Sequence, residues 1–316
     1  MYLEFYQLRE YPFSLACDPR YLYFSAGHKE AMAGMLYCLR ERKGVALLLG
    51  EPGTGKTTLL AAVLEMLPGG VVAQALDTPL HTTPAEAMAA ILSGFGQASE
   101  GLGLSALQAG LRAYLTERHL AGECVLLLID EAQDLNPLVL EQVRLLTNLE
   151  KGGHKLLQII LSGQPELAAH LRTANGRALH QRVAVRCHLA PLNRAETQAY
   201  LAARLDQAGS ARMLFDDGAA ERIHQVSQGI PRVINVVADH CLLAGFAAEA
   251  PRLSRGLVDR VVTQLDELVA VSGNSQDGTI ATGGMEAAPG TTQTPATLQR
   301  FASGWARWAG LAEGSK

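Results

Sequence analysis

The sequence predicts an α/β fold in which a parallel five-stranded sheet is followed by an all-α unit and then by a disordered C-terminal tail. Five continuous apolar runs alternate with helical stretches up to residue 190, and from 191 to 270 the pattern becomes wholly helical. Residues 272–297 are rich in Gly, Ser, Thr and Pro, which marks the start of the tail. Such a segment buries too little apolar surface to offset the entropy lost when it becomes ordered.

The five apolar runs are expected to form the strands of the sheet. They are VALLL at 45–49, VVAQAL at 71–76, VLLLI at 125–129, LQIIL at 157–161 and VAVRCHL at 183–189. A strand that is apolar on both faces is typical of a parallel sheet that helices cover on each side. Residues 1–190 are therefore predicted to hold an N-terminal segment and the sheet-containing core.

Residues 191–270 carry the signals of successive helices. Asn193 and Glu196 have the spacing of a capping box, in which each side chain bonds to the backbone of the other residue. Gly229 lies near an expected helix end, and Pro231 suits the first turn of the next helix. We expect this segment to form a helical lid over the core.

Two further segments follow the lid, a flexible linker at 271–297 and a short amphipathic segment at 298–316. Helical spacing would place the large apolar residues of the second segment on one face: Leu298, Phe301, Trp305, Trp308 and Leu311. Such a helix could dock on a partner or on a membrane surface. The alternative is a weakly ordered tail whose aromatic rings fold onto its own domain.

Composition and charge narrow the class of protein. With 48% apolar and 18% charged residues, the chain has the composition of a globular protein. The net charge of −4 argues against a dedicated nucleic-acid binder without excluding one. The five cysteines have no C-x-x-C spacing, so a zinc site or a disulfide-stapled fold is not expected. Since no signal peptide or transmembrane-length apolar run is evident, we expect a cytoplasmic protein, with the periphery of the inner membrane as a further option.

The strongest chemical signal is GEPGTGKTT at 50–58, which fits G-x-x-x-x-G-K-[ST] between a predicted strand and a predicted helix. Glycines let backbone N–H groups turn toward phosphates, while Lys56 can reach the β and γ oxygens and Thr57 can bind Mg²⁺. A chance glycine turn is the alternative, but the full spacing and context disfavour it. We therefore predict ATP and Mg²⁺ as cofactors. The predicted nucleotide-binding residues in this run are Gly50, Glu51, Pro52, Gly53, Thr54, Gly55, Lys56, Thr57 and Thr58.

The second signal is VLLLIDEAQDL, in which an apolar strand ends in Asp130 and Glu131. Asp130 is expected to support Mg²⁺, mostly through its waters, and Glu131 to polarise the attacking water. Two solvated acids at the start of a loop are the alternative. Ser162 and Gln164 follow the next apolar run and could contact phosphate or water, although ordinary turn residues are an equal alternative.

Arginines are the expected source of charge on the γ-phosphate. Arg232 would lie in the first turn of a lid helix and is assigned to that role. Arg182 lies just before the last strand and is predicted to reach the nucleotide of an adjacent subunit. Arg177 and Arg186 compete with it for this role, and a solvated surface arginine is the alternative for Arg182.

Together with GIPRVINVVADHCLLAGFA at 229–247, these motifs resemble an AAA+ ATPase with a P-loop NTPase core, in which Arg232 takes the sensor 2 position. Three blocks more narrowly resemble the cytoplasmic ATPase module of general secretion pathway protein A (ExeA-like) proteins. They are MYLEFYQLREYPFSLACDPRYLYFSAGHKEAM at 1–32, RERKGVALLLGEPGTGKTTLL at 40–60 and LEQVRLLTNLEKGGHKLLQIILSGQPEL at 140–167. The resemblance implies that Tyr23 and His28 line the pocket of the nucleotide base, with plain core packing as the alternative.

The resemblance also implies a function. It implies a Mg²⁺-dependent ATPase that forms a homo-oligomer, with a hexamer among the options, and that serves a secretion, pilus or exopolysaccharide-export system. Longer relatives continue into a membrane span and a cell-wall-binding domain, whereas this chain enters its linker, so it resembles the shorter, soluble members. The first alternative is a DNA-associated AAA+ ATPase of the transposition target-selection type. The second is a nucleotide-gated scaffold that binds ATP without appreciable hydrolysis.

Overall fold

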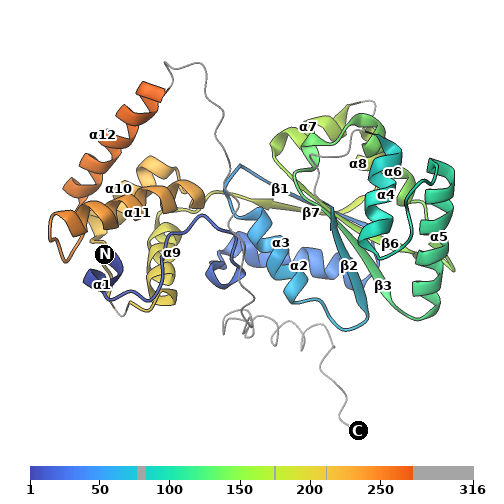
Figure 1. Ribbon diagram of the computed structural model, residues 1–316, viewed down its shortest axis with the longest axis horizontal. Helices are drawn as coiled ribbons and strands as arrows, with labels where there is room; N and C mark the ends of the chain where they lie inside the picture. The colour runs from blue at the N-terminus through green and yellow to red at the C-terminus, as the bar shows by residue number, and fades with distance from the viewer. Residues whose placement is uncertain (77–82, 174–175, 211, 273–316) are drawn as a thin grey trace, which may run out of the picture. The chain divides into compact units, whose positions relative to one another are not determined.

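A computed structural model describes residues 1–76, 83–173, 176–210 and 212–272 of the chain (Figure 1). Its contacts divide into two compact units, one of Phe24–Ala190 and one that joins Met1–Tyr23 to the residues from Pro191 onward. The segment at 298–316 and nearly all of the linker expected at 271–297 lie outside the described residues. Within the described residues, no helix is both long enough and apolar enough to span a bilayer.

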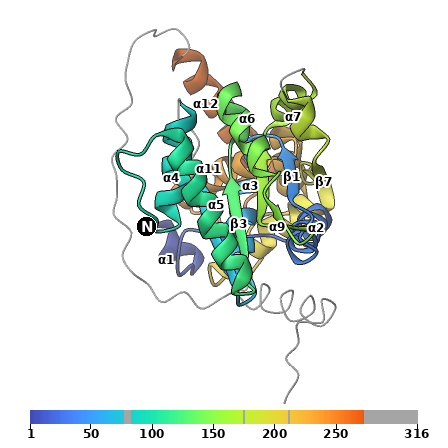
Figure 2. The same cartoon turned by 90° about the vertical axis from the view of Figure 1, so that its right-hand side faces the viewer.

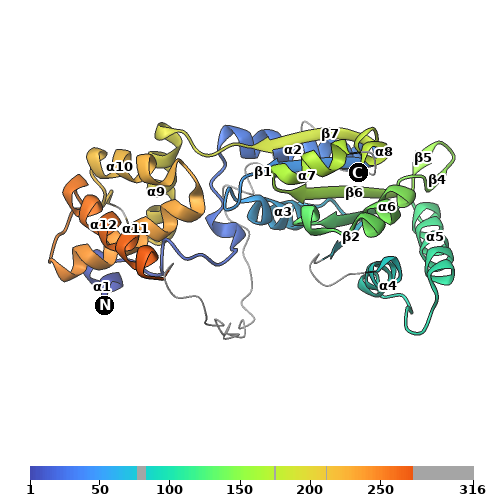
Figure 3. The same ribbon diagram turned by 90° about the horizontal axis from the view of Figure 1, so that it is seen from above.

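The larger unit contains the predicted parallel five-stranded sheet (Figure 3). The strands are β1 (Val45–Gly50), β2 (Val71–Leu76), β3 (Cys124–Ile129), β6 (Leu157–Gly163) and β7 (Val183–Leu189). Their order across the sheet is β2-β3-β6-β1-β7, and each adjacent pair is parallel. All five predicted strands are confirmed. Because the strands are parallel, the segments that follow β1, β3 and β6 emerge at the same edge of the sheet.

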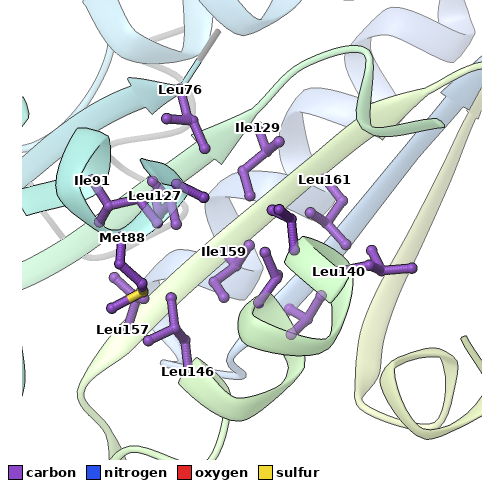
Figure 4. Close-up of a cluster of buried hydrophobic side chains, with 14 of the residues drawn as sticks. Leu76, Met88, Ile91, Leu127, Ile129, Leu140, Leu146, Leu157, Ile159 and Leu161 are labelled. Atoms are coloured by element: carbon purple, nitrogen blue, oxygen red, sulfur yellow. The ribbon is translucent and has the colours of Figure 1, made fainter. Parts of the chain in front are cut away.

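Burial differs between the inner and the outer strands. β3 and β6 are almost wholly buried, and the side chains of Leu127, Ile159 and Leu161 meet those of the covering helices in one apolar cluster (Figure 4). β2 and β7 lie at the two edges: β2 is half-buried along most of its length, and β7 alternates exposed residues with partly or fully buried ones. An edge strand has only one neighbour and is open on its outer side. The apolar run alone therefore overstated the burial of these two strands.

Helices cover the sheet and fill the connections between strands. They are α2 (Ala26–Arg40), α3 (Lys56–Glu65), α4 (Pro84–Gly94), α5 (Leu104–Leu120), α6 (Pro137–Leu146), α7 (Pro165–Arg172) and α8 (Arg177–His180). α2 packs on β7 and β1, while α4 and α5 pack on each other and on β2 and β3 (Figure 2). A short hairpin of β4 (Glu150–Lys151) and β5 (His154–Lys155) precedes β6. The sequence did not predict this hairpin.

The smaller unit is helical, as predicted. It contains α1 (Tyr2–Tyr6), the 3-10 turn η1 (Pro19–Tyr21), α9 (Arg194–Gln207), α10 (Asp217–Ser227), α11 (Pro231–Ala247) and α12 (Arg255–Ser272). The capping box of Asn193 and Glu196 opens α9, and Pro231 opens α11, both as the sequence predicts. α12 ends at Ser272, two residues inside the range expected for the linker.

The N-terminal segment belongs to the helical unit, which corrects its expected place with the core in 1–190. Arg204 of α9 is buried and donates hydrogen bonds to the carbonyl oxygens of Pro12 and Ser14. Its guanidinium lies 4.4 Å from the ring centre of Tyr21, and burial lowers the pKa of this side chain. A buried cation requires such partners, so Arg204 fixes the segment to α9.

Candidate functional site

The glycine-rich run forms a tight loop between β1 and α3, at the carboxyl edge of the sheet. Gly53 and Gly55 have φ angles of 79° and 97°, in the left-handed region that side chains other than glycine rarely adopt. A Cβ on Gly50 would lie 2.8 Å from Thr54 Oγ1 and 2.9 Å from the carbonyl oxygen of Leu189. The loop therefore requires glycine at these three positions, for its backbone conformation at Gly53 and Gly55 and for space at Gly50.

Lys56 lies inside this loop. It is buried, and its Nζ donates to the carbonyl oxygens of Gly50 at 2.9 Å and Glu51 at 3.2 Å. The Thr54 hydroxyl also donates to the Glu51 carbonyl, at 2.8 Å. A cation held beside backbone N–H groups at the start of α3 is a fitting environment for phosphate oxygens.

Asp130 and Thr57 meet across the sheet edge, as the positions of the two motifs predict. Thr57 Oγ1 donates to Asp130 Oδ2 at 2.6 Å, although the two residues are 73 positions apart in the sequence. Asp130 directly follows β3, and Thr57 lies in the first turn of α3. A hydroxyl and a carboxylate are the oxygen donors that Mg²⁺ prefers, so this pair fits the expected metal.

Glu131 has an unusual backbone. Its φ is 47° and ψ is 40°, which is the left-handed conformation, and it opens the 3-10 turn η3 (Ala132–Asp134). Such a conformation costs on the order of 1 kcal/mol or more in a residue with a side chain and persists when its surroundings hold it. Gln133 Nε2 donates to Glu131 Oε2 at 2.7 Å, and Gln164 Nε2 reaches the same oxygen at 3.4 Å. Sequence reasoning missed Gln133, although it lies two positions after Glu131 in the same run.

Ser162 occupies the end of β6, between β3 and β1 in the sheet. It pairs with Leu48 of β1, and the preceding Leu161 pairs with Ile129, the last residue of β3. Its hydroxyl is fully buried and has no hydrogen-bond partner among the described residues. A buried hydroxyl without a partner is costly, which is consistent with a group that bonds only when a ligand is present.

Three of the predicted arginines belong to the core unit, and none of these three lies beside the loop. Arg182 precedes β7 at the amino edge of the sheet and donates to the carbonyl of Ala178 at 3.0 Å and to Asn148 Oδ1 at 2.8 Å. Arg186 is exposed and donates to the carbonyl of His180, and Arg177 is exposed at the start of α8. Arg232 is exposed in the first turn of α11, which belongs to the helical unit.

His28, one of the two residues expected to line the base pocket, belongs to the core unit. It is buried, and its Nδ1 lies 2.7 Å from Ser25 Oγ. Its Nε2 lies 3.2 Å from the point where a Cβ on Gly55 would stand, so the ring contacts the glycine loop. Tyr23 belongs to the helical unit and packs edge-to-face on Tyr200 at 6.0 Å between ring centres.

Comparison with known proteins gives two sequence relationships. Residues 39–171 match the AAA domain family, and this range contains the glycine loop, both acids and β6. The chain is also 39% identical over 310 residues to general secretion pathway protein A of Aeromonas hydrophila. That alignment covers 98% of this chain and 54% of the relative, so the chain spans about half the length of the protein it matches.

Solved structures share the fold at low sequence identity. The ORC2 protein of Aeropyrum pernix, solved in ADPNP–ADP complexes, has a TM-score of 0.60 at 17% identity, over 80% of this chain and 71% of that one. Cdc6p of Pyrobaculum aerophilum has a TM-score of 0.63 at 18% identity, over 82% and 73% of the two chains. The RuvB branch migration motor of Thermotoga maritima has a TM-score of 0.52 at 20% identity, over 77% and 70%. These likenesses establish the fold.

Proposed function

We propose that this chain, which carries an AAA domain and is similar to general secretion pathway protein A, is a Mg²⁺-dependent ATP hydrolase of the AAA+ class. We propose further that it self-assembles and acts as the motor of an envelope secretion, pilus or exopolysaccharide-export system. The observation that carries the proposal is the 2.6 Å contact between Thr57 and Asp130 beside the buried Lys56. It brings the pair proposed to bind Mg²⁺ and the cation proposed to bind phosphate to one edge of the sheet.

The loop residues would hold the triphosphate. Backbone N–H groups of 50–58 and the start of α3 bind the phosphate oxygens, and Lys56 turns from its loop carbonyls to the β and γ oxygens. Mg²⁺ bound by Thr57, and by Asp130 largely through water, would neutralise charge that develops between the β- and γ-phosphates.

Glu131 would accept a proton from the attacking water. Ser162 supports this arrangement because its unpartnered hydroxyl lies at the adjoining strand end, where it can bond to the γ-phosphate or to the water. Gln164 is assigned to the same region through its contact with Glu131. General-base assistance of this kind contributes typically 10²- to 10⁴-fold in rate.

Two arginines would complete the site, one from the lid and one from a neighbouring subunit. Arg232 is assigned to the γ-phosphate of its own chain. Arg182 lies next to Val183, which pairs with Val45 at the opposite end of β1 from the loop. Five residues of strand separate these ends by roughly 17 Å, which exceeds the reach of a side chain. Arg182 could therefore act only on the nucleotide of another copy, and this role requires the proposed homo-oligomer, for example a hexamer.

The proposal places the chain in the cytoplasm, where it meets ATP, with its client at the inner membrane. The test is a pull-down from native cells with Glu131→Gln, which should retain ATP and hold the client longest. The control is Glu166→Gln, an exposed glutamate of α7 that lies outside the proposed site. Enrichment of envelope proteins by the first variant alone is the expected result. Enrichment of duplex DNA instead, with ATPase stimulation that falls as salt rises, would replace the secretion role by the DNA-associated one.

A further inference from the structure

A side-chain amide joins Glu131 to the end of β6. Gln133 Nε2 donates to Glu131 Oε2 at 2.7 Å, and Gln133 Oε1 accepts from the backbone N–H of Gln164 at 3.0 Å. The same Nε2 also lies 3.4 Å from Asp134 Oδ2. A backbone N–H can only donate, so it fixes which end of the amide is oxygen and turns the NH₂ group toward the carboxylate.

The surrounding chain holds this amide in place. η3 carries Gln133 between Ala132, which is 2% exposed, and Asp134. A Cβ on Gly163 would lie 2.7 Å from Gln133 Oε1, so the strand end passes close against the amide. Since both ends of the amide are bonded, the Glu131 carboxylate is tied to the segment that carries Ser162 and Gln164.

The hydrogen bond from Gln133 matters because it fixes the orientation of the Glu131 carboxylate. A glutamate side chain has three rotatable bonds, so by itself it can adopt many orientations. Because the backbone of Glu131 is left-handed, its side chain leaves the chain in a different direction from that of a residue that continues β3. Gln133 and Gln164 both reach Oε2. Oε1 is then the oxygen left to receive a proton from water.

We propose that Gln133 is a positioning residue for ATP hydrolysis, which fixes the Glu131 carboxylate through Oε2 and couples it to the end of β6. The inference rests on the proposed role of Glu131 as general base. Water would lose a proton to Oε1 as its oxygen bonds to the γ-phosphorus. The bond from that phosphorus to the β–γ bridging oxygen breaks, and ADP leaves with the electron pair. Gln133 touches neither water nor nucleotide in this step.

The test compares phosphate release by wild type, Gln133→Leu and Gln133→Glu at saturating MgATP. Leucine is similar in size to glutamine but can form neither the bond to Glu131 nor the bond from the Gln164 N–H. Glutamate keeps an acceptor for the Gln164 N–H and places a second anion beside Glu131. We expect kcat to fall about 10- to 100-fold in each variant, the range for lost supporting shells around reactive groups. KM and the affinity for ATP should change less than twofold. Gln142→Leu is the matched control, since Gln142 accepts from Gln108 in the same unit and lies outside the proposed site.

A double variant separates positioning from a structural role. If Gln133 acts through Glu131, Gln133→Leu should cause no further loss of single-turnover rate in the Glu131→Gln background. An equal loss in both backgrounds would overturn the inference, and so would wild-type kcat in Gln133→Leu. Thermal unfolding and ATP binding verify that each variant is folded. Unchanged hydrolysis by Glu131→Gln would instead overturn the assignment of Glu131 as general base. A failure of that assignment is therefore distinguishable from a failure of the role proposed for Gln133.

Discussion

Gly229 precedes α11 and sets the position of its first turn. Its φ is +75°, and a Cβ there would stand 1.9 Å from the carbonyl oxygen of Leu192. Gly229 also accepts a hydrogen bond from the N–H of Leu192 at 2.8 Å. An alanine at this position must therefore adopt a left-handed conformation and push the Leu192 backbone away by more than about 1 Å to reach an ordinary C···O contact near 3.3 Å.

The expected cost of Gly229→Ala follows from these contacts. The left-handed conformation costs roughly 1–2 kcal/mol, and loss of the Leu192 hydrogen bond costs about 1 kcal/mol more. A total of about 2–3 kcal/mol should lower the melting temperature of a unit of about 100 residues by roughly 8 °C or more. Because Arg232 lies three residues further on, the shift should also disturb any contact of Arg232 with nucleotide.

Gly256→Ala is the matched control. Gly256 lies in α12, is exposed, and has nothing within 4 Å of the Cβ position. Alanine should leave stability unchanged or raise it by up to about 1 kcal/mol. The assay is thermal and urea unfolding followed by far-UV circular dichroism. Equal unfolding midpoints for Gly229→Ala and wild type would refute the argument that this contact fixes the start of α11.

Three further predictions concern the core unit. Gly50→Ala should weaken ATP binding about tenfold or more, because overpacking costs about 1–3 kcal/mol, and calorimetric titration measures this. Gly69→Ala is the control and should bind ATP normally, because the space around the Cβ position of Gly69 is open. Arg182→Ala and Lys56→Ala should each be inactive, and mixing them should restore phosphate release if the arginine acts between subunits. Burial is the main cause that lowers the pKa of His119, and the nearby positive charge of Arg42 lowers it further. The neutral ring therefore contributes stability above pH ~6.5, and this contribution is lost as the pH falls and the ring becomes protonated. The wild-type melting temperature should therefore drop more between pH 7.5 and 5.5 than that of His119→Gln.

Local patterns were sufficient to predict the sheet and the phosphate loop. Each strand is a run of neighbouring apolar residues, and the loop depends on glycines at fixed spacing. Parallel pairing then brings Asp130 to Thr57, because the end of β3 and the start of α3 share one edge of the sheet. These features need little information beyond short segments of sequence.

Features that depend on distant contacts were beyond such patterns. The bonds of Arg204 to Pro12 and Ser14 join residues about 190 positions apart, so the place of the N-terminal segment could not be predicted locally. The role of Gln133 depends on the left-handed backbone of Glu131 and on the N–H of Gln164. Neither this backbone conformation nor this hydrogen bond can be inferred from the local sequence pattern. The short β4–β5 hairpin has too few residues to produce a periodic signal.

The dependence of phosphate release on Mg²⁺ tests the central claim most directly. The measurement titrates Mg²⁺ at saturating ATP for wild type and for Asp130→Asn, which keeps the size of the side chain and removes its charge. Hydrolysis by the wild type should require the metal, and Asp130→Asn should need far more Mg²⁺ or lose about 100-fold or more in kcat. Equal activity of the two proteins at every Mg²⁺ concentration, or wild-type turnover without divalent metal, would contradict a metal-assisted site at the Thr57–Asp130 contact.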